Sequence, residues 1–275
     1  NDGAVNTLVF RRADSGTYDG WNAYIATDGT PRFQLDGDAQ VNISATGDIG
    51  ADGKWHHYLV SCDRSGNADV YIDGLLNVSA DITSANNSIN VTAPIYIGQN
   101  NGNSARFEGK ISQFKVFNTI LTQAQAQELY TKPETVLPTG VSASNLKLDL
   151  PMQEGSGSYI YDGSGNQNHG TITGATWVSG EEYGYQSSLV RSNTPMIFDG
   201  SNDYVDCVTT NMLQNATNMS ISAWIFPTHS ASSGDDYYSI INQFDSSASK
   251  KSWGIWLKAP DNSTDAHIHF NDSAS

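Results

Sequence analysis

A short polar loop near the middle of the chain carries the side chains best suited to bind a metal ion. The loop runs from Asp162 to Asn168, and Asp162, Asn166 and Asn168 supply one carboxylate and two amide oxygens. Ca²⁺ takes about six to eight oxygen ligands, so this spacing indicates a calcium site. The alternative is a network of Asx-type turns, in which the same side chains bond the backbone and no metal is needed.

Aromatic side chains near loops form a second group with possible chemistry. Flat rings bind sugars through apolar contact with the sugar face. Tyr237 and Tyr238 follow a Gly-Asp-Asp run at the edge of a loop, and Tyr18 is a third candidate for such a contact. Trp21 and Trp253 lie within strand patterns, which predicts that they belong to the core.

No set of residues indicates catalysis. His56 and His57 are neighbours in a strand pattern and should face opposite ways, so they are not expected to bind one metal together. No Ser-His-Asp or Cys-His arrangement is evident, so no catalytic residue is assigned and the chain is not expected to be an enzyme. Cys62 and Cys207 have no CxxC spacing. We expect two half-buried free thiols, with a disulfide between them as the open alternative.

The composition limits the class of partner. Fourteen Lys and Arg against 29 Asp and Glu give the 275 residues a formal net charge of −15, which repels phosphate backbones. Nucleic acid is therefore not an expected partner. Only 16% of residues are charged and 38% are hydrophobic, a mix that favours short strands joined by polar turns. No run of about 18 apolar residues occurs, so membrane insertion is not expected.

The clearest strand pattern lies at residues 55–63. Tyr58, Val60 and Cys62 fall on one face there, and the residues between them fall on the other. A turn and a returning strand at 68–73 follow, which predicts a hairpin. Further strands are expected at residues 7–12, 21–26, 32–35, 95–98, 110–117, 146–150, 170–172, 194–198, 204–207, 219–226, 238–244, 253–258 and 267–270.

One short helix is expected near residues 122–130. Thr122 is its predicted N-cap, and Gln125 stands three residues later, the spacing of a capping box. Pro133 should end the helix. Residues 133–144 carry two prolines and few large apolar side chains, which is typical of a linker.

The two ends of the chain resemble each other. Trp253 follows Trp21 by 232 positions, and the same offset aligns further apolar residues, namely Leu8 with Ile240, Val9 with Ile241, Tyr24 with Trp256 and Ile25 with Leu257. The offset indicates a tandem repeat with a period of about 232 residues.

Several segments together resemble the laminin-G-like, or concanavalin A-like lectin/glucanase, superfamily. Gly53-Lys54-Trp55-His56-His57-Tyr58 running into residues 70–74, followed by 95–98 and 107–122, is similar to the closing half of such a domain. The loop 162–170 and the segment 198–205 are similar to its opening half. The acidic, asparagine- and serine-rich style is also similar to tandem domains in virion appendage proteins of marine bacteriophages.

The resemblance implies an all-β fold, an antiparallel two-sheet jelly-roll sandwich. It also implies a domain organisation in which residues 1–132 are the C-terminal part of one jelly-roll, 133–144 are a linker, and 145–275 are the N-terminal part of a second. The alternative is one circularly permuted domain, in which the two halves complete each other.

The resemblance also bears on function. The family often carries a structural Ca²⁺ around the 162–168 loop and commonly adds an acidic residue where this chain has Ser112. Its glycosidases use a Glu-x-Asp-x-x-Glu signature, which is absent here.

The predicted function is therefore a non-catalytic, lectin-like binding or adhesion module in a larger repetitive surface or virion protein. It would recognise glycan or cell envelope, neighbour other repeats or subunits, and lie extracellularly or on a virion. A purely structural repeat of a fibre, sheath or capsid-decorating protein is the alternative, and a glycoside hydrolase-related enzyme is less favoured.

Overall fold

Strands dominate the computed structural model. It describes residues 6–12, 20–25, 30–36, 40–47, 49, 52–85, 94–99, 106–178, 195–207, 213, 216–228, 237–243 and 253–258, and every structural statement below concerns these residues. They contain one α-helix, α1 (Gln123–Thr131), and two 3-10 turns, η1 (Thr83–Ala85) and η2 (Ala143–Asn145). No helix in this part of the chain is both long and apolar enough to cross a membrane.

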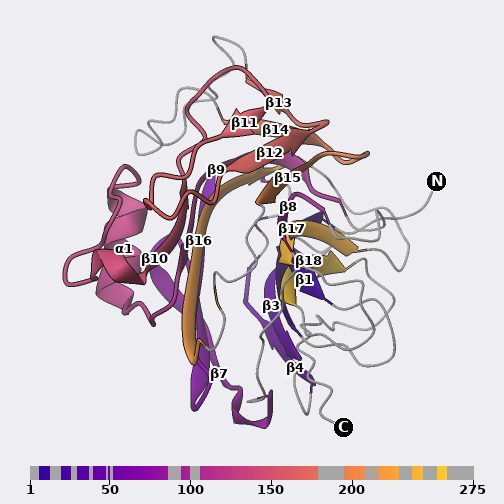
Figure 1. Cartoon of the computed structure of the whole chain (residues 1–275). Coiled ribbons are helices and arrows are strands. Elements are labelled where there is room, and N and C mark those ends of the chain that lie inside the picture. The colour runs from indigo at the N-terminus through magenta and orange to yellow at the C-terminus, as the bar shows by residue number, and fades with distance from the viewer. Residues whose placement is uncertain are drawn as a thin grey trace, which may run out of the picture.

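An eight-stranded antiparallel sheet forms one layer. Its strands are β5 (His56–Asp63), β6 (Asn67–Ile72), β7 (Leu75–Asp81), β9 (Glu108–Phe117), β10 (Leu146–Leu150), β13 (Thr176–Trp177), β14 (Met196–Asp199) and β16 (Asn218–Pro227). They follow the order β13-β14-β9-β16-β5-β6-β7, and β10 pairs with β9. Figure 1 shows α1 on the outer side of this layer, beside β10.

The facing layer consists of a six-stranded and a four-stranded sheet. The first is β17-β18-β1-β2-β3-β4, built from β1 (Asn6–Arg12), β2 (Gly20–Ile25), β3 (Pro31–Asp36), β4 (Gln40–Ser44), β17 (Tyr237–Gln243) and β18 (Trp253–Lys258). The second is β11-β12-β15-β8, built from β8 (Ile95–Ile97), β11 (Tyr159–Ile160), β12 (Gly170–Thr173) and β15 (Tyr204–Cys207). The predicted antiparallel sandwich is therefore confirmed (Figure 1).

The core lies between the two layers and follows from strand alternation. Tyr58, Val60 and Cys62 are buried in it, as the alternation predicts, together with apolar residues of the facing layer such as Phe33 and Ile97. The opposite face of β5 is buried as well. A second apolar cluster packs there beneath α1, made of Leu59, Tyr71, Phe117, Leu121, Ala126, Leu129 and Leu146. Cys62 and Cys207 are both buried free thiols.

Four strands were not predicted, namely β4, β7, β11 and β13. In β7 the apolar Leu75 and Leu76 are both exposed, which hides any two-residue alternation.

The turn before β7 reverses the direction of the chain after β6. Asp73 and Gly74 have φ angles of 51° and 76°, and two successive positive φ values are those of the type I′ turn that favours Asp-Gly in hairpins.

The predicted capping box at the start of α1 is confirmed. The backbone N–H of Gln125 donates to Thr122 Oγ1 at 3.4 Å, and the backbone N–H of Thr122 donates to Gln125 Oε1 at 2.9 Å. The segment after the helix packs back on it. The backbone N–H of Thr139 donates to Glu128 Oε2 at 2.8 Å, so this end of the predicted linker is tied to the helix.

Strands from both halves of the chain share the eight-stranded sheet. β16 pairs with β5 on one side and with β9 on the other, and β10 and β14 also pair with β9. This pairing joins the two halves of the chain in one sheet. The division into 1–132, 133–144 and 145–275 as parts of neighbouring repeats stays a prediction, and so does the permuted single-domain alternative.

Candidate functional site

A row of polar and aromatic side chains crosses the outer face of the four-stranded sheet. In β15, Val205 and Cys207 point into the core, so the alternating Tyr204 and Asp206 point outward. Tyr96 does the same between the buried Ile95 and Ile97 of β8.

The strand register aligns these outward positions. Tyr159 of β11 pairs with Thr171 of β12, Thr171 pairs with Asp206, and Asp206 pairs with Tyr96. Directly opposed residues on one sheet face are in side-chain contact range. The four residues therefore form one continuous row, which we call the Asp206 row.

Asp206 is the unusual member of this row. Its Oδ1 atom is buried yet accepts no hydrogen bond in the described part of the chain. Burial raises the pKa of Asp206 to about 6, and no other cause contributes. Among the described residues, no charged group contributes to this shift.

Two tyrosine rings border this carboxylate. The rings of Tyr96 and Tyr204 lie edge to face with centroids 5.5 Å apart. Burial, and next the negative charge of Asp206, raise the pKa of Tyr96 to about 12. Tyr159, at the other end of the Asp206 row, is 53% exposed. The face thus combines an unpaired acceptor with apolar ring surface, which suits a ligand rich in hydroxyl groups.

The predicted calcium loop forms a network of hydrogen bonds. The carboxylate of Asp162 accepts four of them, from the backbone N–H groups of Asp149, Ser164 and Asn168 and from the hydroxyl of Ser164, at 2.8 to 3.0 Å. A carboxylate offers about four lone-pair sites, so the donors present fill them.

The two asparagines of this loop also bond to the backbone. Asn166 and Asn168 donate their side-chain amides to carbonyls of Leu146 and Lys147 at 2.9 Å. A cation at Asp162 would have to displace these donors or share its oxygens with them. Among the described residues no group of three or more His, Cys, Asp or Glu is suited to a metal ion. Calcium at Asp162, Asn166 and Asn168 stays a prediction.

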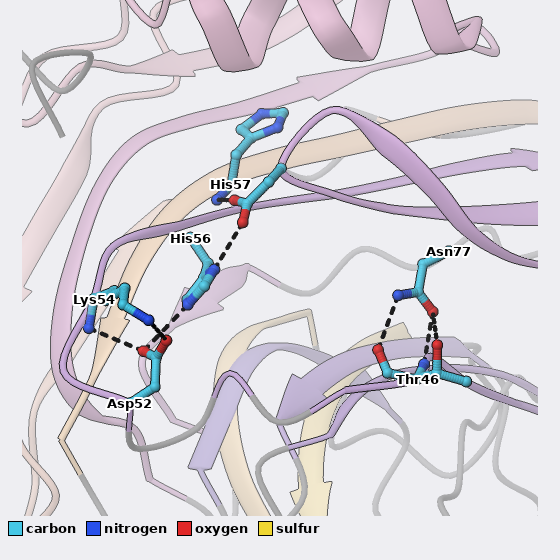
Figure 2. A network of polar contacts seen from close by, with 7 residues as sticks. Thr46, Asp52, Lys54, His56, His57 and Asn77 are labelled. Atoms are coloured by element: carbon cyan, nitrogen blue, oxygen red, sulfur yellow. Dashed lines mark hydrogen bonds and ion pairs between the residues drawn. The ribbon is translucent and has the colours of Figure 1, made fainter. Parts of the chain in front are cut away.

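His56 and His57 point to opposite faces of β5, as the alternation predicts (Figure 2). His56 lies between two carboxylates, with Nδ1 2.9 Å from Asp73 Oδ2 and Nε2 3.2 Å from Asp52 Oδ1. Burial alone would lower the pKa of His56, but the hydrogen bonds and charges of Asp73 and Asp52 outweigh it and raise that pKa.

His57 is fully buried on the face beneath α1. Its Nε2 lies 2.8 Å from the hydroxyl oxygen of Ser222, and its ring packs against Tyr130 and Trp224. Burial lowers the pKa of His57 to about 3, so the ring is neutral at ordinary pH. Both histidines therefore take part in structural contacts on separate faces.

The structure describes only part of the aromatic residues that the sequence indicated as sugar contacts. Tyr18 lies outside the described residues. The backbones of Tyr237 and Tyr238 belong to β17, paired with Lys258 and Leu257 of β18, but their side chains lie outside what the structure describes. Their sugar-binding role stays a prediction.

Sequence reasoning missed the Asp206 row. The available signal was the alternation in Ile95-Tyr96-Ile97 and Tyr204-Val205-Asp206-Cys207, which places the polar residues on one face. It did not reveal that β8 and β15 are neighbours, because their pairing joins distant parts of the chain.

The family comparison bears on the first half of the chain. Residues 1–127 match the model of the concanavalin A-like lectin/glucanases superfamily. The resemblance seen in the sequence is confirmed over these residues, which run from β1 into α1 and include Tyr96. No curated protein and no solved structure matches the chain. The similarity to bacteriophage appendage proteins stays a prediction.

Proposed function

We propose that the chain is a non-catalytic carbohydrate-binding module of a larger surface or virion protein, and that sugar binds at the Asp206 row. The lectin-type family match over residues 1–127 supports a carbohydrate-binding class. The unpaired Oδ1 of Asp206 beside the rings of Tyr96 and Tyr204 is the observation that carries the proposal.

A bound ligand would remove an unfavourable feature of the free protein, the buried acceptor of Asp206. A buried oxygen without a donor is unfavourable, and an ionised carboxylate more so. Sugar hydroxyls are donors of the right kind, and a carboxylate accepts them strongly because it is charged. The tyrosine rings supply apolar surface for the sugar face. Oδ1 is buried, so the Asp206 side chain would turn toward the sugar, whose hydroxyls would then supply the hydrogen bonds that Oδ1 lacks among the described residues.

The same geometry favours binding without catalysis. Glycosidases of the common mechanisms place two carboxyl groups about 5 to 10 Å apart across the scissile bond. The pKa of Asp206 is raised by burial with no contribution from another acid. Asp206 therefore acts in this proposal as a hydrogen-bond acceptor.

A glycan array with the whole chain tests this function, followed by titration calorimetry on any sugar retained. We expect Asp206→Asn and Tyr96→Ala each to weaken binding about tenfold or more, the loss of about 1.4 kcal/mol or more. Asp69→Asn is the matched control, because Asp69 also contacts a tyrosine, with its Oδ2 3.3 Å from the Tyr71 hydroxyl, but on the other layer. An array without any retained glycan, or an Asp206→Asn protein that binds normally, would refute the proposal.

A purely structural repeat is the second candidate function. It is favoured by the duplicated strand pair described next, which concerns assembly and needs no ligand. Measuring the native mass of the parent protein separates the candidates, because a structural repeat belongs to a fibre, sheath or capsid and a free monomer would exclude that role.

A further inference from the structure

Two hairpins in the six-stranded sheet are equivalent residue by residue. In β1–β2, Thr7 pairs with Tyr24 and Arg11 with Trp21. In β17–β18, the residues 232 positions later form the same pairs, with Ser239 opposite Trp256 and Gln243 opposite Trp253. The offset is the one that aligns Trp21 with Trp253 in the sequence.

The irregularity in these hairpins is duplicated as well. The register of β1–β2 shifts between Thr7 and Val9, and that of β17–β18 shifts between Ser239 and Ile241, again 232 positions later. A β-bulge at equivalent positions is a shared local feature, because bulges disrupt the ladder and do not recur by alternation alone. The two hairpins are therefore two copies of one structural unit.

The two copies lie beside each other in the sheet. β1 and β17 are parallel, with Thr7 opposite Ser239 and Val9 opposite Ile241. Every other pairing between described strands is antiparallel. β2 occupies one edge of β1 along its length, so β17 and β18 share the other edge.

The hairpins differ in what lies beyond their second strand. β2 pairs along its whole length with β3, from Gly20 opposite Asp36 to Ile25 opposite Pro31. β18 meets β1 at Phe10 opposite Gly254 and pairs with no β3-type strand among the described residues. Since β18 is the copy of β2, it has the backbone register to pair with β3 in place of β2.

We propose that β17–β18 is an exchangeable hairpin, which takes the place of β1–β2 against β3 of a second copy of this chain. β18 pairs with β1 at Gly254 alone, and a strand with the register of β2 fits against β3 without a change of register. The partner is a separate molecule of this same chain. This inference does not depend on carbohydrate binding.

A double-mutant cycle with one proline substitution in each hairpin of the full chain tests whether the hairpins are interchangeable. Proline removes a backbone N–H, and Val9 and Ile241 hold equivalent central positions. We expect Val9→Pro or Ile241→Pro alone to lower the thermal midpoint by about 2 °C or less, because the other hairpin fills the place. The double variant should lose about 10 °C or more. The proposal would be overturned if the losses in thermal midpoint of the two single variants added up to that of the double variant. It would also be overturned if one single variant lowered the midpoint as much as the double variant does.

Cross-linking of mixed chains tests the partner directly. Exchange would place Gly254 of one copy opposite Gln34 of the other, because Asn22 pairs with Gln34 in the resident hairpin. A tagged Gln34→Cys chain and an untagged Gly254→Cys chain are refolded together and oxidised. We expect a mixed disulfide dimer, whereas Gln34→Cys mixed with Ser79→Cys, on the exposed β7, should give only background. Equal yields from the two mixtures would contradict the exchange.

Discussion

Lys115 Nζ and Asp149 Oδ1 lie 2.6 Å apart, with side chains only 3% and 2% exposed. Lys115 belongs to β9 and Asp149 to β10, and the two residues face each other in the ladder. The ion pair therefore joins the strand before α1 to the strand after it. Two charges removed from water are tolerated in a protein interior only as a pair.

Removing one partner of this ion pair should lower the free energy of unfolding strongly, whereas replacing both partners by apolar residues should lower it only slightly. We expect Lys115→Met to lower the free energy of unfolding by about 3 to 5 kcal/mol, because Asp149 is left buried without its cation. The double variant Lys115→Met with Asp149→Leu should recover most of the loss. Urea denaturation measures both, and a single variant costing under about 1 kcal/mol would show that the pair is solvated.

Asp206 should make the protein less stable as pH rises. Its pKa is about 6 in the folded chain against 3.8 for the ordinary group. The folded state therefore binds more protons between these values, so the free energy of unfolding falls from about pH 4 to pH 6 and then levels. Asp203 has a pKa raised to about 6 through burial and contributes with the same sign.

The variant Asp206→Asn isolates the Asp206 contribution, because Asp203 remains in both proteins. Its stability minus that of the unaltered chain should grow from pH 4 to pH 6 and stay constant above. Urea midpoints at half-unit pH intervals give this difference. A difference that does not change with pH would mean that the side chain is hydrated.

His57 should have the opposite effect at low pH. Its pKa is about 3 in the folded chain and near 6.5 when the chain unfolds, so the unfolded state binds the extra proton. Stability from neutral His57 is complete above about pH 6.5 and declines as pH falls toward 3, by at most about 1.4 kcal/mol per pH unit. His57→Gln keeps a partner for Ser222 and should flatten this decline.

The adjacent His56 serves as the control for His57. The pKa of His56 is raised, so its stabilising contribution is complete below about pH 6.5 and is lost as pH rises through the folded value. His56→Gln should therefore alter the neutral-to-alkaline side of the stability profile. If both variants altered the stability in the same pH range, the assignment of the two rings to different environments would be wrong.

Asp162 should stabilise its loop without any metal. Asp162→Ala removes the acceptor of four hydrogen bonds in a residue that is 8% exposed, and we expect a loss of about 2 kcal/mol or more even in EDTA. Asp81→Ala is the exposed control, since Asp81 accepts two hydrogen bonds from Thr83, and it should cost under about 1 kcal/mol. A thermal midpoint that falls on adding EDTA in the unaltered chain, but not in the Asp162→Ala protein, would show that the loop holds a divalent cation.

Local features of the fold were predictable because they depend on neighbouring residues. The alternation of Tyr58, Val60 and Cys62 predicts which face of β5 enters the core, and the backbone geometry of a strand enforces it. Thr122 and Gln125 predict the start of α1 through a bond between residues three apart. β7 escaped prediction because Leu75 and Leu76 lie at an exposed edge, where burial does not select for alternation.

By itself, the sequence determined the sandwich class, the helix start, the opposite orientations of His56 and His57, and the 232-residue offset between the chain ends. Only the tertiary structure decided that Asp206 lies opposite Tyr96, that Lys115 meets Asp149, and that the hydrogen-bond acceptors of Asp162 are already filled. The physical reason is that strand neighbours are chosen by the packing of whole faces, which joins residues far apart in the chain. A pattern of two or three residues fixes the direction of a side chain, and the sheet fixes what that side chain meets.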